Sequence, residues 1–272
     1  MKIWYRSTRG VLAAWTVATL FGFAAPAVAQ AQAGTAAANG SESVVKRIDP
    51  TDFSTRLEVR NEYQDLQGGG SMNMLIPRLD YAVSSTFSLR LETPIVAVDP
   101  NTPGNNGGSG MGNLLVRTSY RAARGQGYAV VVAAEFIFDT ASKDSLGSGK
   151  NVIAPLVFAS LDVPRYHSVF FPFLQHYFTV SGDDARPEVN YTSFKPVWLT
   201  RWPDRYYTVV EPHFIIDHER GGRVGLTLEG EFGRFLDRNL ALWARPGVGL
   251  HGDNIPLVYN WNFEVDLRYI FN

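Results

Sequence analysis

The sequence predicts an all-β fold, a transmembrane up-and-down antiparallel β-barrel of about twelve strands. Three observations lead to this prediction. The chain begins with the features of an export signal, it continues in long runs that alternate apolar and polar positions, and the connections between those runs are alternately short and long. Each observation is weak by itself, and together they indicate an outer-membrane protein of a Gram-negative bacterium.

The export signal occupies the first residues. Lys2, Arg6 and Arg9 give a positive start, residues 11–23 are apolar, and Ala27-Val28-Ala29 matches a cleavage site. The apolar stretch is shorter than the roughly 20 residues that a membrane-spanning helix needs. We therefore expect residues 1–29 to be a cleavable signal peptide.

Charge and cysteine content exclude several classes of function. The full chain has 25 Lys and Arg against 26 Asp and Glu, and loss of the three basic residues of the signal leaves 22 against 26, a net charge of −4. That balance is no footprint of a nucleic-acid-binding protein. The chain has no cysteine, so thiol chemistry and cysteine-based metal sites are excluded. No cofactor and no metal site are predicted.

The mature chain has two predicted parts. Residues 30–50 are small and polar, which predicts a flexible periplasmic N-terminal arm. Residues 51–272 form the predicted barrel, without an internal linker or a repeat of fixed period.

The last run shows the alternation most clearly. One face of residues 258–271 is apolar, and the other carries polar and charged side chains. A soluble sheet would turn the apolar face inward, whereas a membrane barrel turns it outward to lipid. The alternation alone fits both. The apolar face comprises Tyr259, Trp261, Phe263, Val265, Leu267, Tyr269 and Phe271, and the polar face Asn260, Asn262, Glu264, Asp266 and Arg268.

Run length, aromatic residues and connections favour the membrane. A tilted barrel strand needs about 9 to 11 residues to cross the hydrocarbon, longer than most soluble strands. Aromatic residues near the run ends suit interfacial girdles: Tyr206 and Tyr207, Trp198 and Trp202, Trp261 and Tyr269. The predicted strands are 55–66, 71–84, 87–97, 111–122, 128–139, 151–161, 168–180, 189–201, 206–217, 223–233, 239–249 and 257–271.

The connections between these runs set the topology. Short turns such as SST, ARGQG and LDR alternate with longer segments such as DPNTPGNNGGSG, TASKDSLGSGK and SGDDARPE, and only the first outer loop, LQGGG, is short. Outer-membrane barrels have short periplasmic turns and longer outer loops. An even number of strands then places both ends of the barrel on the periplasmic side.

The polar faces of the strands predict the residues that line the lumen. These side chains form either a structural charge network or a path for solutes, and the sequence leaves both open. The predicted lumen-lining residues are Arg56, Glu58, Arg60, Glu62, Arg78, Asp80, Arg90, Glu92, Arg117, Arg121, Glu135, Lys195, Glu211, His213, Glu229, Glu231, Arg245, Glu264, Asp266 and Arg268.

The Gly/Asn-rich segment 99–112 is the candidate constriction loop. It has no charge after Asp99 and no lysine of a phosphate-binding loop. It is either a mobile surface loop or a lid over the barrel mouth, with Asp99, Asn105, Asn106, Gly110 and Gly112 as its candidate residues.

The histidines do not predict catalysis. His167 and Ser168 are neighbours and point to opposite faces of a strand. His176 has no evident serine partner, and His213 shares a face with Glu211 without a nucleophile. His218 and His251 fall in outer loops. We predict that the chain is not an enzyme and assign no catalytic residue; a lipid-modifying hydrolase is the least favoured alternative.

A short motif resembles a known family. The stretch Gly110-Met111-Gly112-Asn113 followed by apolar residues 114–116 resembles the Gly-x-Gly-Asp-apolar stretch of the MetA-pathway of phenol degradation family of outer-membrane proteins, with Asn113 in place of Asp. Phe138-Asp139-Thr140-Ala141 stands where that family has a Pro-Thr-Gly corner. The resemblance implies an outer-membrane channel or transporter, for aromatic or other hydrophobic compounds.

The expected function is therefore passive or facilitated diffusion of a small solute, and the alternative is a structural barrel with a plugged lumen. Expected partners are outer-membrane lipid and lipopolysaccharide, the solute, and the barrel-assembly machinery. That machinery would recognise the aromatic C-terminal strand, in which Tyr269 and Phe271 are in phase and Asn272 follows.

Overall fold

The computed structural model describes residues 46–101 and 107–271. The predicted signal peptide and residues 30–45 of the predicted arm lie outside the described residues, so both stay predictions. Within the described ranges, none of the helices is long and apolar enough to cross a membrane.

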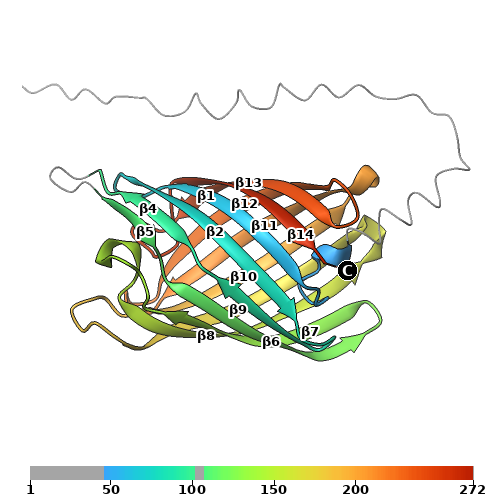
Figure 1. Ribbon diagram of the computed structural model, residues 1–272, viewed down its shortest axis with the longest axis horizontal. Helices are drawn as coiled ribbons and strands as arrows, with labels where there is room; N and C mark the ends of the chain where they lie inside the picture. Colours follow the sequence, from blue (N-terminus) through green and yellow to red (C-terminus); the bar gives the residue numbers. More distant parts are fainter. Residues whose placement is uncertain (1–45, 102–106, 272) are drawn as a thin grey trace, which may run out of the picture. The chain divides into compact units, whose positions relative to one another are not determined.

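The described residues form one closed, all-antiparallel barrel (Figure 1). β3 and β4 follow each other in the chain and both pair with β2, so together they form one interrupted strand of the wall. β5 pairs with β4 and β6 pairs with β3, so β5 and β6 together form the next interrupted strand. The wall thus has twelve strands, as predicted. The strands are β1 (Arg56–Asp65), β2 (Ser71–Ala82), β3 (Phe87–Glu92), β4 (Ile95–Asp99), β5 (Gly108–Met111), β6 (Leu114–Gly125), β7 (Tyr128–Phe138), β8 (Lys150–Val163), β9 (Ser168–Gly182), β10 (Asn190–Arg201), β11 (Tyr206–Asp217), β12 (Arg223–Phe235), β13 (Leu240–His251) and β14 (Trp261–Ile270).

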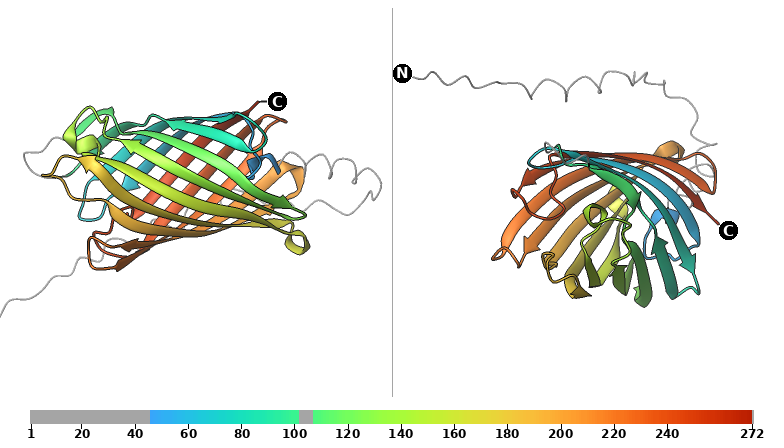
Figure 2. Two further views of the ribbon diagram at one scale, coloured as in Figure 1. Left: turned by 90° about the horizontal axis from the view of Figure 1, so that it is seen from below. Right: turned by 60° about the vertical axis from the view of Figure 1, so that its left-hand side comes forward.

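Pairing of the first and last strands closes the ring. β1 pairs with β14 over its whole length, from Arg56 opposite Ile270 to Asp65 opposite Trp261, and its other edge pairs with β2. No edge of β1 or β14 is left to pair with another chain, which is how barrels avoid aggregation. Figure 2 shows the closed wall from two further directions.

The two rims of the barrel differ. We call one rim the turn end, where the connections 83–86, 126–127, 164–167, 202–205 and 236–239 lie together with the start of β1 and the end of β14. The opposite rim is the loop end, with connections 66–70, 139–149, 183–189, 218–222 and 252–260 and the described residues 100–101 and 107 between β4 and β5. Four short 3-10 helices lie in the described connections and ends: η1 (Lys46–Ile48), η2 (Asp144–Leu146), η3 (Pro164–Tyr166) and η4 (Pro203–Arg205).

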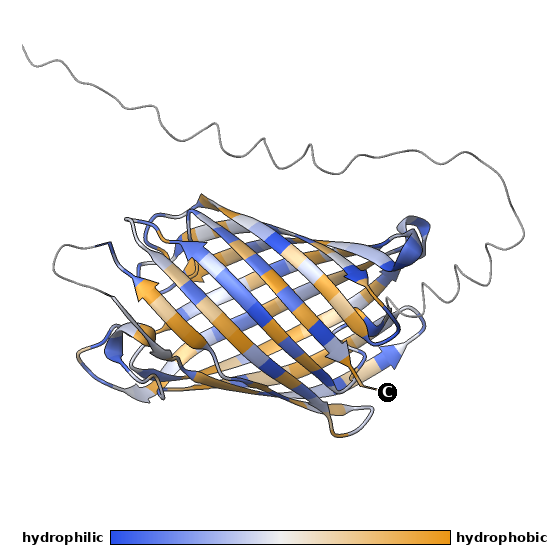
Figure 3. Cartoon of the chain, turned by 45° about the horizontal axis from the view of Figure 1, so that its top comes forward, coloured by the Kyte–Doolittle hydropathy of each residue, from blue (hydrophilic) through white to orange (hydrophobic). Residues whose placement is uncertain are grey.

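The alternation of the sequence becomes an apolar outer wall and a polar or tightly packed interior. Along β14 every second residue is exposed and every other one is buried. Figure 3 shows apolar and polar positions alternating along the strands. Exposed apolar side chains such as Leu57, Val59 and Leu267 cover the outside, the arrangement expected for a wall that faces lipid.

Two aromatic residues differ from the predicted placement. Tyr207 is only 1% exposed inside the barrel, because consecutive residues of a strand point to opposite faces and its neighbour Tyr206 takes the outer one. Tyr259 is 4% exposed, since residues 252–260 form a connection that precedes β14 and turns inward. The predicted girdle residues Trp202, Tyr206, Trp261 and Tyr269 are on the outside.

Candidate functional site: the lumen and its two ends

A belt of charged side chains crosses the inner face of the wall. One part of the belt lies on β14, β1, β2 and β3. There, Arg78 Nε donates to Glu92 Oε1 at 2.6 Å and Arg78 Nη1 donates to Glu58 Oε2 at 2.9 Å. Arg268 Nε donates to the other oxygen of Glu58 at 2.6 Å. Glu58 therefore joins two arginines from the strands on either side of it, because all three residues occupy the inward position of their register.

The belt continues around the ring on β10 to β13, which follow β14 in the strand order. Lys195 Nζ donates to Glu211 Oε1 at 2.7 Å, and Arg245 Nη1 donates to Glu229 Oε2 at 3.3 Å. Arg245 also pairs with Glu231. On β6 and β7, Arg117 pairs with Glu135. Strands distant in the chain thus carry the same arrangement, an inward-facing cationic side chain paired with an inward-facing carboxylate.

Few of the belt's charges face open solvent. Lys195 keeps 35% of its side chain exposed, the largest value among the ion pairs of the belt. Removing one partner of such a pair leaves a buried charge uncompensated, which is costly. Both signs are abundant, so the belt is no simple selector for anions or cations.

The structure places the predicted lumen-lining residues on the inner face. Those joined by ion pairs are Arg56, Arg60, Arg78, Arg90, Arg117, Arg121, Lys195, Arg245 and Arg268 with Glu58, Glu62, Asp80, Glu92, Glu135, Glu211, Glu229, Glu231, Glu264 and Asp52, which precedes β1. His213 and Asp266 are buried beside them.

The turn end is filled by the residues before β1, which we call the plug (residues 46–53). Ile48 is 7% exposed and belongs to an apolar cluster of the inner wall with Phe171, Leu199 and Tyr207. Phe53 packs against a second inner cluster. The last described residues of the predicted arm, 46–50, are therefore not a flexible segment outside the barrel, because Ile48 packs against apolar side chains inside it.

Polar contacts fix the plug to the wall. Thr51 Oγ1 lies 2.9 Å from Ser160 Oγ on β8, and Arg121 Nη1 donates to the Thr51 carbonyl at 3.0 Å. The Arg121 guanidinium also stands 5.6 Å above the ring of Phe53. No sequence pattern indicates these contacts, since Ile48 and Phe53 are single apolar residues among polar ones.

At the loop end, connection 139–149 folds inward over β5. Gly110 has no side chain, and a Cβ there would stand 3.1 Å from Leu146 Cδ1 and would meet Ser142 Oγ. Leu146 is 7% exposed. Glycine in a strand allows another segment to approach closely, so the alternating glycines 108, 110 and 112 form the seat of this connection.

A second connection, 252–260, folds inward over β12 and β13. A Cβ on Gly225 would stand 2.7 Å from Val258 and 2.9 Å from Ile255, both of which are buried. Tyr259 Oη donates to Glu229 Oε1 at 2.5 Å and so joins this connection to the charged belt. Burial raises the pKa of Tyr259.

These observations correct the predicted constriction loop. Asp99 ends β4, Gly110 lies in β5 and Gly112 follows it, so all three belong to the wall. Asn105 and Asn106 lie outside the described residues. Two strands extend further than predicted, because the small residues 108–111 pair with β4. The described connections that enter the lumen are 139–149 and 252–260.

The wall is interrupted beside this seat. Pro94 separates β3 from β4, since proline has no N–H for the ladder. Its carbonyl still accepts from Gly112 N at 2.8 Å, opposite the break between β5 and β6.

The histidines occupy two different faces. His213 Nε2 lies 2.7 Å from Ser193 Oγ inside the lumen. On the outer wall, Thr192 Oγ1 lies 3.1 Å from His176 Nδ1 and 2.9 Å from His218 Nε2. The sequence reading found no serine partner for His176 and missed the threonine, which only the register of β9 and β10 brings opposite it.

Comparisons with known proteins show the fold. No protein-family model and no curated protein matches the chain. Among solved structures, it is similar to an outer membrane channel from Pseudomonas putida F1, with a TM-score of 0.61, 12% identity, and coverage of 82% of this chain and 100% of the other. The NanC porin matches with a TM-score of 0.57 at 8% identity over 79% and 99% of the two chains. The KdgM porin in complex with disordered oligogalacturonate matches with a TM-score of 0.53 at 13% identity over 80% and 99%. The chain therefore has the fold of outer-membrane β-barrels.

Proposed function

We propose that the chain is an outer-membrane channel for small solutes, closed at rest by its plug and by two inward connections. This proposal rests mainly on one observation: the ring of strands closes by its own pairing and does not need these segments. The twelve strands close on themselves through β1 and β14, and the lumen is occupied by the plug, by residues 139–149 and by residues 252–260. Movable closures inside a closed wall are what a gated pore requires.

The interior also suggests the class of solute. Toward the turn end the inner wall is apolar and aromatic, with Phe171, Phe235 and Trp243 in one cluster. On β10 to β13 the charged belt lies between this cluster and the loop end, whereas on β1, β2 and β14 it reaches the turn end itself. An apolar, aromatic wall beside charged side chains suits a small aromatic or otherwise hydrophobic compound, in line with the resemblance of residues 110–116 to the MetA-pathway family.

Location and partners belong to the same proposal. The apolar outer wall would contact outer-membrane lipid and lipopolysaccharide. The predicted signal peptide would bring the chain to the periplasm, and the aromatic C-terminal strand would be recognised by the barrel-assembly machinery.

The plug offers a direct test, because the chain contains no cysteine. The double variant Thr51→Cys/Ser160→Cys places two thiols where hydroxyl oxygens lie 2.9 Å apart and can lock the plug to β8 by a disulfide. The matched control is Ser168→Cys/Thr200→Cys, whose hydroxyl oxygens lie 3.0 Å apart between β9 and β10 at the same end.

Both variants are folded into liposomes, and the flux of a small aromatic solute is measured under oxidising and reducing conditions. We expect oxidation to stop flux through the plug-locked variant, reduction to restore it, and the control to conduct in both states. The absence of flux through reduced, correctly folded protein would favour the alternative, a structural barrel whose paired charges and plug seal the lumen permanently.

A further inference from the structure

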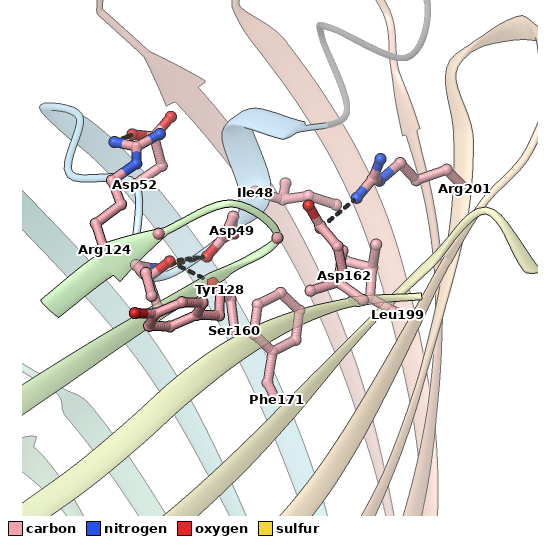
Figure 4. A pocket seen from close by; sticks show the side chains of 15 residues that line it. Ile48, Asp49, Asp52, Arg124, Tyr128, Ser160, Asp162, Phe171, Leu199 and Arg201 are labelled. Carbon is pink, nitrogen blue, oxygen red and sulfur yellow. Dashed lines mark hydrogen bonds and ion pairs between the residues drawn. The ribbon is translucent and has the colours of Figure 1, made fainter. Parts of the chain in front are cut away.

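A pocket of about 180 Å³ lies at the turn end, between the plug and the wall (Figure 4). The plug contributes Ile48, Asp49, Thr51 and Asp52 to it, and strands β6 to β10 with the turn residue Gly127 contribute the rest. The pocket therefore sits beside the plug, where a solute that has crossed the charged belt would reach the turn end.

The floor of the pocket is apolar. It is made by Ile48, Ala129, Val169, Phe171 and Leu199, each of which is buried. Figure 4 shows Phe171 and Leu199 beneath the charged residues of the rim. Most of the surface that the pocket exposes is polar, and these side chains supply its smaller apolar part, on which an apolar body would lie out of water.

Two arginines stand on the rim. Arg201 Nη2 lies 3.5 Å from Asp162 Oδ1, and Arg124 Nη1 lies 3.7 Å from Asp52 Oδ1. The carboxylates keep 43% and 53% of their side chains exposed. The Arg124–Asp52 pair is exposed on both sides and contributes little to stability, so another carboxylate can replace Asp52 without a large loss. The Arg201 side chain is only 10% exposed, and a ligand carboxylate in the place of Asp162 would keep its guanidinium paired.

A third carboxyl group on the rim is engaged elsewhere. Asp49 Oδ1 accepts from Thr51 N at 2.7 Å and from Thr51 Oγ1 at 2.6 Å. Burial raises its pKa, and the nearby Asp52 and Asp162 raise it further. The rim therefore becomes less negative when Asp49 is protonated, while the two guanidinium groups keep their charge at any ordinary pH.

We propose that this pocket is a binding site for a small amphipathic carboxylate, a compound of about one ring whose apolar body lies on the Phe171–Leu199 floor and whose carboxylate binds Arg201, with Arg124 as the second cation of the rim. The volume supports this size, because a cavity of about 150 Å³ accepts benzene. A planar guanidinium binds a carboxylate through two parallel hydrogen bonds, which gives the site its preference for that group.

The inference deepens the proposed channel function and rests on it, since it assigns the pocket to the solute's exit. It also concerns binding alone, so it can be tested without transport. The test uses the full mature chain, folded in detergent micelles, and isothermal titration calorimetry with three probes: benzoate, acetate and benzyl alcohol. Benzoate has both the ring and the carboxylate, and each of the others lacks one of them.

We expect benzoate to bind more tightly than acetate and benzyl alcohol, and Arg201→Gln to weaken benzoate at least about tenfold, the loss of a charge-assisted hydrogen bond. Ala129→Leu, which adds an apolar side chain to the floor without touching the arginines, should also weaken it. The matched control is Arg165→Gln, a turn-end arginine of η3 outside the pocket.

Equal benzoate affinity in the wild type and the Arg201 variant would overturn the inference. So would tighter binding of benzylamine, titrated as a fourth probe, than of benzoate. Liposome flux of benzyl alcohol, measured on the same preparations, separates the two proposals. Flux without benzoate binding removes the pocket assignment alone, whereas benzoate binding without any flux removes the channel.

Discussion

Gly110 of β5 lies directly under Leu146 of η2, so closely that a Cβ at position 110 would stand 3.1 Å from Leu146 Cδ1. The contact joins the wall to connection 139–149, and the absence of a side chain at one position decides whether that connection can lie inside the lumen. Real Cβ atoms rarely tolerate such a distance, so a larger residue must displace the connection.

The first prediction uses this contact. Gly110→Val should push residues 139–149 out of the lumen and raise the single-channel conductance of the protein in planar bilayers. The matched control is Gly230→Val on β12, where a Cβ would meet its first neighbour only at 4.0 Å. If both variants conduct like the wild type, connection 139–149 does not limit the pore.

The second prediction concerns Arg186, which holds the same connection from the neighbouring one. Its guanidinium donates to the carbonyls of Asp144 at 3.0 Å, Gly147 at 2.9 Å and Ser148 at 3.3 Å. Arg186→Gln should remove these charge-assisted bonds and increase hydrogen exchange of backbone amides in residues 139–149 at least about tenfold. Arg165→Gln is the control. Unchanged exchange would mean that the glycine seat alone holds the connection.

The strand wall could be predicted because the apolar or polar character of each strand residue indicates whether it faces outward or inward. In β14 the sequence alternation and the burial pattern agree residue by residue, and the short and long connections fixed the two rims. Tyr207 was misplaced where two aromatic residues stand together, since the composition of a run end does not say which of them points outward.

The closures of the lumen could not be predicted in the same way. Ile48 packs in one cluster with Phe171 and Leu199, which are distant in the chain, and no periodicity of the sequence predicts such packing. Glycines 108, 110 and 112 did carry a usable signal, because glycine at every second position of a strand leaves one face bare for another segment. The composition of segment 99–112 instead predicts a loop, either mobile or folded as a lid over the barrel mouth.

The third prediction concerns the charged belt. Glu58→Gln removes the carboxylate shared by Arg78 and Arg268, so that the largely buried Arg268 guanidinium loses the carboxylate it pairs with, while Arg78 keeps its bond to Glu92. Breaking a buried ion pair lowers the free energy of unfolding by about 3 to 5 kcal/mol. Removing the charge of an exposed side chain lowers it far less. Reversible urea unfolding from lipid vesicles should therefore show a loss of that size, against a small change for Glu219→Gln at the loop end. A loss equal to the control would mean that water solvates the belt.

The fourth prediction concerns the pH dependence of the plug. Burial raises the pKa of Asp49 above its ordinary value near 3.8, with Asp52 and Asp162 adding to the effect, and Arg124 and Arg201 are the cations on the same rim. A carboxyl group whose pKa is higher in the docked state binds its proton more tightly there. Docking of the plug is therefore strongest at low pH and weakens as the pH rises from 3.8 through the raised pKa. A spin label at Pro50→Cys should become more mobile over this range, and the additional change Asp49→Asn, which keeps an oxygen acceptor for Thr51, should abolish the trend. If the label's mobility follows pH equally in both proteins, Asp49 does not control the plug, and the ion pairs of Asp52 and Asp162 become the groups to test.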